Sequence, residues 1–187
     1  MSTLVVQNLR GVTSSGGLIN VHPDSVVYSP GSVIQVASVT KTDTFSTTTT
    51  LASGGSLVTG LSVTITPKKL SSKLYVYCVL NCAGTSTITQ VYAWLARGAT
   101  KIGAGDAASS RIGSGARFYY ENNAVSGTIP LAFLDSPAST TAVTYNVYVG
   151  TQTASGSAVI NRTISDTDNN FDGSRTSSTL TVMEIAV

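Results

Sequence analysis

The stretch from Lys73 to Ala83 most constrains how this chain can fold. Apolar side chains at the even positions from Leu74 to Leu80 alternate with a partly aromatic set at the odd positions from Tyr75 to Asn81. A period of two in β-branched and aromatic residues indicates a β-strand with one buried face and one half-covered face. Such a strand cannot stand alone in water, so it must lie centrally in a packed sheet.

The same alternation recurs along the chain between turns rich in Gly, Ser, Thr, Asn and Pro. Further strands are expected at residues 33–45, 61–67, 88–96, 117–121, 127–134, 143–149, 158–162 and 178–187. After a turn at residues 84–86, the segment 88–96 is expected to form a hairpin with 73–83. About eight or nine strands at this spacing predict an all-β fold, an antiparallel β-sandwich with a jelly-roll-like arrangement.

Residues 1–31 differ from the sandwich domain expected at residues 32–187, because their apolar residues form no alternating face. The apolar residues near the start are Leu4, Val5, Val6 and Leu9. One interpretation is a frayed terminus. The other is an extended N-terminal arm that adds a strand to another subunit or to a shell. We favour the arm, because a frayed tail does not need these apolar residues.

The charge and the hydropathy of the chain argue against two classes of partner, nucleic acid and a membrane. Charged residues make up 11% of the sequence and the net charge is +2, against about 25% charged residues in an ordinary domain. Basic residues are scattered, which argues against nucleic-acid binding. No apolar run approaches the roughly 18 residues of a membrane span, and the start does not resemble a signal peptide, so we expect synthesis in the cytoplasm.

Ser and Thr take the place of the missing charges. Threonine fits the pleated surface of a strand and serine serves turns. A charge-poor, hydroxyl-rich surface is typical of a protein that contacts neighbouring subunits.

We find no catalytic constellation. His22 is the only histidine and stands beside Pro23 in the irregular first segment, so a Ser-His-Asp triad is not expected. Cys78 and Cys82 would lie about 13 Å apart on one strand face, too far for a disulfide, and are expected to be buried thiols. Trp94 has two interpretations, a ligand platform or a core residue, and a single aromatic in an alternating strand favours the core. The chain is therefore predicted not to be an enzyme.

One motif points to a metal. The spacing of Asp168, Asn170 and Asp172 before Gly173 matches the first half of an EF-hand calcium loop. The bidentate Glu expected at the twelfth position is replaced by Thr179. The other interpretation is a solvated turn whose side chains bond to their own backbone, with nearby arginines balancing the charge. Calcium is the one cofactor that the sequence suggests.

Several segments, taken in order, are similar to one family. They are residues 33–46, 58–67, 72–76, 134–137, 144–148, 160–162 and 178–185. Over about residues 32–187 the chain resembles a family of tailed-phage virion proteins, common in cyanophages and other marine phages and usually labelled tail fibre or structural protein. The resemblance implies a β-rich, trimeric module exposed on the virion, and it brings no catalytic residues.

The sequence has no repetitive shaft, and only about 30 residues precede the expected domain. Both features favour a homotrimeric decoration (cement) protein on the capsid, in contact with other virion proteins such as the major capsid protein. The alternative is a tail-fibre or adaptor module that binds a host receptor or glycan through the loops at 97–115 and 165–177.

Overall fold

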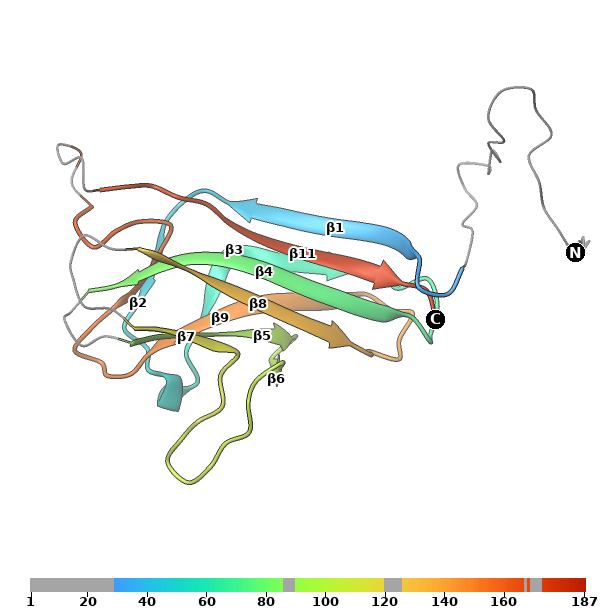
Figure 1. Ribbon diagram of the computed structural model, residues 1–187, viewed down its shortest axis with the longest axis horizontal. Coiled ribbons are helices and arrows are strands. Elements are labelled where there is room, and N and C mark those ends of the chain that lie inside the picture. The colour runs from blue at the N-terminus through green and yellow to red at the C-terminus, as the bar shows by residue number, and fades with distance from the viewer. Residues whose placement is uncertain (1–28, 86–89, 120–125, 167, 169–172) are drawn as a thin grey trace, which may run out of the picture.

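The computed structural model describes residues 29–85, 90–119, 126–166, 168 and 173–187. In this part of the chain nearly all regular structure is β-strand (Figure 1). The strands are β1 (Val33–Lys41), β2 (Phe45–Thr47), β3 (Ser56–Ile65), β4 (Lys73–Gly84), β5 (Gln90–Arg97), β6 (Thr100–Ile102), β7 (Ala116–Tyr119), β8 (Gly127–Asp135), β9 (Val143–Thr151), β10 (Ala158–Ile160) and β11 (Ser178–Ile185). A three-residue 3-10 helix, η1 (Leu51–Ser53), precedes β3. The all-β prediction is confirmed, and the described residues include no helix long and apolar enough to cross a bilayer.

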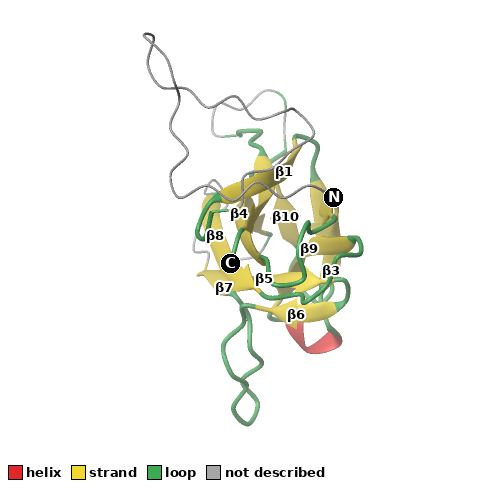
Figure 2. Ribbon diagram, turned by 90° about the vertical axis from the view of Figure 1, so that its right-hand side faces the viewer, coloured by secondary structure: helices red, strands yellow, loops and turns green. Residues whose placement is uncertain are grey.

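The strands form two sheets that face each other (Figures 1 and 2). In the first, here called the β4 sheet, the order is β1-β11-β4-β8, and β10 followed by β2 extends it beside the far end of β4. In the second, the β5 sheet, the order is β3-β9-β5-β7, with β6 beside the other end of β5. All these pairs are antiparallel. The eight strands other than β2, β6 and β10 pass between the sheets in the order of a jelly roll, so the predicted fold class is confirmed.

The predicted hairpin between residues 73–83 and 88–96 is wrong. β4 pairs with β11, β8 and β10, whereas β5 pairs with β9, β7 and β6 in the other sheet. Alternation reports which side chains a strand buries, and β4 and β5 bury theirs in the same core. It does not report from which side of that core each strand packs.

The core lies between the two sheets and is built mainly from their inward side chains. On β4 the inward set runs from Leu74 to Cys82, and each member is fully buried. Facing it from the β5 sheet are Val91, Tyr145 and Val147, also fully buried. The prediction that β4 is central is confirmed, because it has neighbours on both sides.

Both cysteines are free thiols in this core, as predicted. Burial raises the pKa of Cys78 and of Cys82 from 9.0 to about 12. At neutral pH they therefore behave as small hydrophobic side chains.

One carboxylate is buried at the end of the core. Asp135, at the end of β8, accepts hydrogen bonds from the Tyr145 hydroxyl at 2.6 Å and from Arg97 Nη1 at 3.1 Å. The pKa of Tyr145 is raised, first by burial and then by its bond to Asp135. This cluster connects the β4 sheet to the β5 sheet.

A second buried carboxylate fixes the connection between β3 and β4. Glu184 on β11 accepts hydrogen bonds from the Gln35 side chain and from the backbone N–H of Lys68, the latter at 2.7 Å. Gln35 also donates to the carbonyl of Thr66 at 2.7 Å. The connection is thereby held against β1 and β11.

Candidate interaction surfaces

The outer face of the β4 sheet carries almost no charge. Four strands contribute to it, and the register of their pairing gives the neighbours across the sheet. The outward positions are Val36, Ser38 and Thr40 on β1; Thr179, Thr181, Met183 and Ile185 on β11; Lys73, Tyr75, Tyr77, Val79 and Asn81 on β4; and Thr128, Pro130, Ala132 and Leu134 on β8. Of these positions only Lys73, at one corner, is charged.

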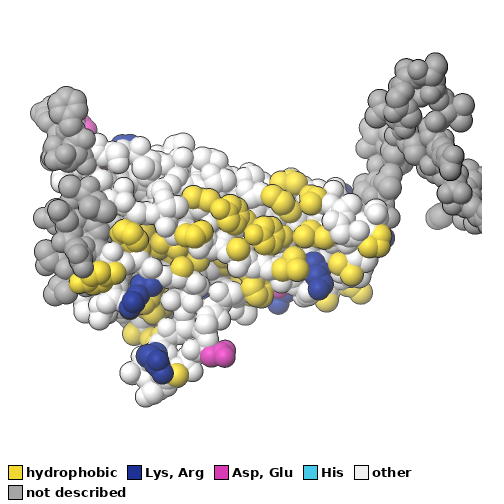
Figure 3. Space-filling view, in the orientation of Figure 1, with side chains coloured by type: hydrophobic (Ala, Val, Ile, Leu, Met, Phe, Trp, Pro, Cys, Tyr) yellow, Lys and Arg dark blue, Asp and Glu magenta, His cyan; other side chains and the backbone are white. Residues whose placement is uncertain are grey.

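Apolar residues on this face form a continuous row across all four strands. Val36 lies opposite Met183, Met183 opposite Tyr75, and Tyr75 opposite Leu134. Val36 is 57% exposed and Leu134 is 46% exposed. Figure 3 shows the hydrophobic side chains as a broad band along the molecule, with few charged ones among them. Contiguous exposed apolar patches are uncommon on monomeric soluble proteins. Where they occur, they mark sites of contact with other molecules.

The hydroxyl groups on the same face bond to one another across the strands. Ser38 Oγ lies 2.8 Å from Thr181 Oγ1, and Thr40 Oγ1 lies 3.1 Å from Thr179 Oγ1. A hydroxyl that already has a protein partner loses less when water leaves the surface. The face can therefore be covered by a partner at a low desolvation cost.

Two aromatic side chains lie near the middle of this face. The rings of Tyr75 and Tyr77 are nearly parallel, with centroids 6.4 Å apart and planes at 8°. Tyrosine is enriched in protein interfaces because it offers a large apolar surface with a polar end. The sequence identified this parity as half-covered, which the structure confirms, but it did not identify the four-strand face.

The loop predicted to contact partners, residues 97–115, is partly regular, and its middle projects away from the β5 sheet (Figures 1 and 2). It contains β6, and Lys101 Nζ donates to the carbonyl of Gly113 at 2.8 Å. Ala108 and Arg111 exchange two backbone hydrogen bonds of 3.0 Å. The loop therefore has a defined shape.

Trp94 is buried, as predicted, but it lies outside the main core. It points to the outer side of the β5 sheet, where its ring stacks on Tyr148 at 5.8 Å. Lys101 Nζ lies 4.4 Å from its ring centroid, and burial lowers the pKa of that lysine. With 3% of its surface exposed, Trp94 belongs to a second, smaller packing layer under the loop.

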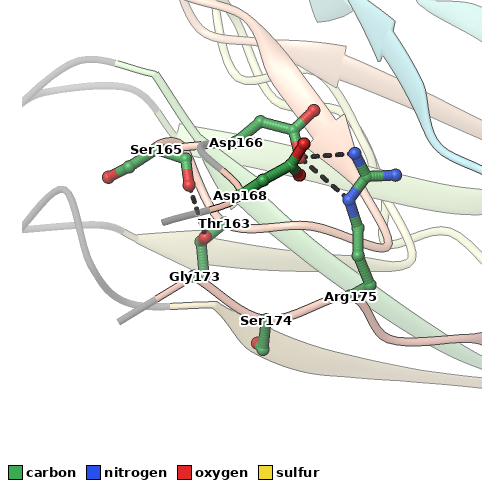
Figure 4. A pocket seen from close by; sticks show the side chains of 7 residues that line it. All are labelled: Thr163, Ser165, Asp166, Asp168, Gly173, Ser174 and Arg175. Atoms are coloured by element: carbon green, nitrogen blue, oxygen red, sulfur yellow. Dashed lines mark hydrogen bonds and ion pairs between the residues drawn. The ribbon is translucent and has the colours of Figure 1, made fainter. Parts of the chain in front are cut away.

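The predicted calcium loop lies only partly within the described residues, which include Asp168 but not Asn170 or Asp172. Asp166 and Asp168 line a small polar cavity of about 210 Å³. Figure 4 shows their two carboxylates beside each other. Asp166 is bound by Arg175, at 2.7 Å from Nη2 and 2.8 Å from Nε.

The Nε atom of Arg162 lies 3.8 Å from the same carboxylate. The expected charge balance by arginine is therefore present for Asp166. Because Asn170 and Asp172 lie outside the described residues, the calcium site stays a prediction.

The predicted arm residues Leu4, Val5, Val6 and Leu9 lie outside the described residues. The structure does show where the last residues of the expected arm, 29–31, join the sheet. Gly31 N donates to the carbonyl of Ala186 at 2.8 Å, and Ala186 N donates to the carbonyl of Ser32 at 2.9 Å. The segment therefore meets the sheet where β1 and β11 lie side by side, at a corner of the uncharged face.

No protein-family model and no curated protein matches the sequence. Among solved structures, the chain is similar to one of infectious bursal disease virus, Gx strain, with a TM-score of 0.42 and 16% identity over 91% of this chain and 41% of that chain. It is also similar to the VP2 subviral particle of the same virus, with a TM-score of 0.41 and 15% identity over 91% of this chain and 42% of that one. The chain thus spans about two fifths of the length of these viral chains.

Proposed function

We propose that this protein is a structural component of a tailed-phage virion, a homotrimeric decoration protein that binds the capsid surface. The observation that carries the proposal is the uncharged outer face of the β4 sheet. Monomeric proteins rarely expose a four-strand face with a single charge at its corner. A subunit that packs against its copies or a shell buries such a face in the contact. The sequence segments that, in their order along the chain, resemble phage virion proteins support the same role.

The size of the face indicates that it does not act alone. Strands about 4.8 Å apart and outward positions about 6.8 Å apart give four strands of four positions an area of roughly 500 Å². A standard interface buries about 800 Å² on each partner. The apolar residues Leu4 to Leu9 of the arm would supply the remainder, because the preceding segment joins the domain at a corner of this face.

The alternative proposal is a tail-fibre or adaptor module that binds a host receptor. The observation that favours it is the defined shape of the loop at 97–115, since binding loops are held by a rigid scaffold. It predicts few copies per particle, and loss of adsorption when the loops at 97–115 and 165–177 are changed.

Counting copies per particle by quantitative mass spectrometry separates the two. A decoration protein is present in a large, fixed number that follows the capsid lattice. A fibre module is present in a few copies.

Adding purified protein to particles that lack it tests the arm. We expect the full chain to bind and a chain beginning at residue 29 to remain folded but not bind. Equal binding by both chains would show that the arm is not the attachment segment.

A further inference from the structure

A groove lies on the outer side of the β5 sheet, away from the uncharged face. One wall is η1, with Leu51 and Ala52, and the other is the loop at 103–115. Figure 2 shows η1 and this loop projecting on the same side of the sheet. The groove has a volume of about 410 Å³, which is within the range of small-molecule sites. Its lining residues are Leu51, Ala52, Tyr92, Ser110, Arg111, Ile112, Arg117 and Gln152.

Two glycines fix the walls. Gly150 lies opposite Tyr92 in the sheet, and a Cβ on it would stand 2.9 Å from the backbone N of Leu51. The missing side chain therefore lets η1 lie against the sheet. In the other wall, a Cβ on Gly113 would meet the carbonyl oxygen of Gly105 at 1.9 Å. Both walls are set by the fold before any ligand arrives, which lowers the entropy cost of binding.

Two arginines line the groove, and their environment differs from that of the other described arginines. Arg97, Arg162 and Arg175 each lie against an aspartate. Arg111 and Arg117 have no carboxylate partner within the described residues, and no Asp or Glu lines the groove. The two guanidinium groups that have no carboxylate partner in the described part of the chain thus share one concave site.

A residue of β5 next to the groove holds one of these arginines, Arg117, in place. Gln90 Oε1 accepts a hydrogen bond from Arg117 Nη1 at 3.0 Å and another from the Tyr92 hydroxyl at 2.8 Å. Arg117 and Tyr92 are also directly opposite each other in the β5–β7 pair. A single amide oxygen therefore orients both a cation and an aromatic side chain.

We propose that this groove binds a carboxylate-bearing sugar, such as a uronic acid residue of a surface polysaccharide. Guanidinium groups recognise carboxylates through paired hydrogen bonds. Tyr92, Leu51 and Ile112 offer apolar surface for the C–H face of a sugar ring, and Gln152 offers an amide for its hydroxyl groups.

This site deepens the receptor-binding alternative by naming a ligand class, and it is independent of the assembly role of the other sheet. A particle count that supports decoration would leave it standing. Failure to bind sugar would leave the decoration role standing.

The test is a calorimetric titration of the full chain with an oligoglucuronate and with the same oligosaccharide methyl-esterified at its carboxyls. We expect binding of the acidic sugar that weakens at least about tenfold on esterification, because a hydrogen bond to a charged group is lost. Equal binding of the two sugars, or binding of neither, would overturn the proposal. A hexamer of glutamate is the third probe, and tighter binding of that peptide would assign the groove to a protein partner instead.

Three substitutions that remove the same charge locate the site. Arg111→Gln and Arg117→Gln should each weaken binding of the oligoglucuronate about tenfold. Arg175→Gln, in the other cavity, is the matched control and should bind as the unchanged protein does. An equal loss in all three would indicate non-specific charge attraction and would overturn the proposal. Because Arg111 lies on the loop, its variant remains informative if Arg117→Gln fails to fold.

Discussion

At the scale of single residues, Asp135 has the largest effect that we can argue from its contacts. Its carboxylate is buried and accepts from both Tyr145 and Arg97. We expect Asp135→Ala to lower the free energy of unfolding by about 3 kcal/mol, because the Tyr145 hydroxyl loses its partner inside the core and Arg97 loses its anion. Urea denaturation followed by Trp94 fluorescence measures this value.

Tyr145→Phe is the matched comparison for that substitution. It removes one hydrogen bond but leaves the Arg97–Asp135 pair, so we expect a loss of only about 1 kcal/mol. An equal loss in the two variants would show that the ion pair contributes nothing.

The two buried thiols make stability depend on pH. Their folded pKa is about 12, whereas in the unfolded chain it returns to an ordinary value near 9. A raised folded pKa gives stability that is complete below the unfolded value and is lost as the pH rises above it. From about pH 8 to pH 10 we expect the free energy of unfolding to fall by about 1.4 kcal/mol for each thiol.

A variant without cysteine isolates this contribution from the tyrosines and lysines that titrate in the same range. Cys78→Ala with Cys82→Ala is less stable at neutral pH, because it leaves cavities. Its stability should nevertheless fall less steeply between the two pH values. Parallel slopes for the variant and the unchanged protein would contradict the assignment of the pH dependence to the thiols.

At the scale of elements, the turn from η1 into β3 offers a comparison between neighbouring glycines. Gly54 and Gly55 both have positive φ, at 90° and 63°. A Cβ on Gly54 would meet nothing within 4 Å, whereas a Cβ on Gly55 would stand 2.3 Å from the Trp94 ring. Gly54→Ala should cost about 1 kcal/mol for its backbone alone, and Gly55→Ala about 2 to 4 kcal/mol because it also overpacks the ring.

Fluorescence provides the readout, because Trp94 is the only tryptophan. We expect a shifted emission maximum in Gly55→Ala and an unchanged one in Gly54→Ala. If both variants kept the original spectrum and the same stability, Gly55 would not lie in close contact with the Trp94 ring.

The strands also show how much of the fold could be predicted from the sequence. Alternation located the long strands and the buried parity of β4, because inward side chains from Leu74 to Leu80 must avoid water in any sandwich. It missed β2 and β6, which are three residues long and mix polar with apolar side chains, whereas the equally short β10 is entirely apolar and was predicted. It also placed β4 and β5 in one hairpin, because a jelly roll moves consecutive strands between sheets and local pattern carries no information on that step.

Whether a candidate site could be predicted from the sequence depended on how close its residues are along the chain. The uncharged face arises from four strands whose register brings Val36, Met183, Tyr75 and Leu134 into one row, and only the fold defines that register. Likewise Arg111 and Arg117 become a pair in one groove only when η1 and the loop flank the same strand. The pairing of Asp166 with arginine was predictable, because those residues are close in sequence.

At the scale of the whole molecule, a single lysine placed on either sheet tests which face is an interface. Thr181 and Thr64 are matched, because each bonds to a hydroxyl directly opposite at 2.8 Å: Thr181 to Ser38 on the uncharged face, and Thr64 to Thr144 on the β5 sheet. Both substitutions lie on outward faces, so each should change the free energy of unfolding by less than about 1 kcal/mol.

Their effects on assembly should differ. Thr181→Lys would bury an unpaired ammonium group in the proposed contact, and we expect it to weaken self-association and particle binding at least about a hundredfold. Thr64→Lys should assemble as the unchanged protein does. Analytical ultracentrifugation and a particle-binding assay measure both. If Thr64→Lys were the disruptive variant, the β5 sheet would be the assembly surface, and the uncharged face would need another explanation.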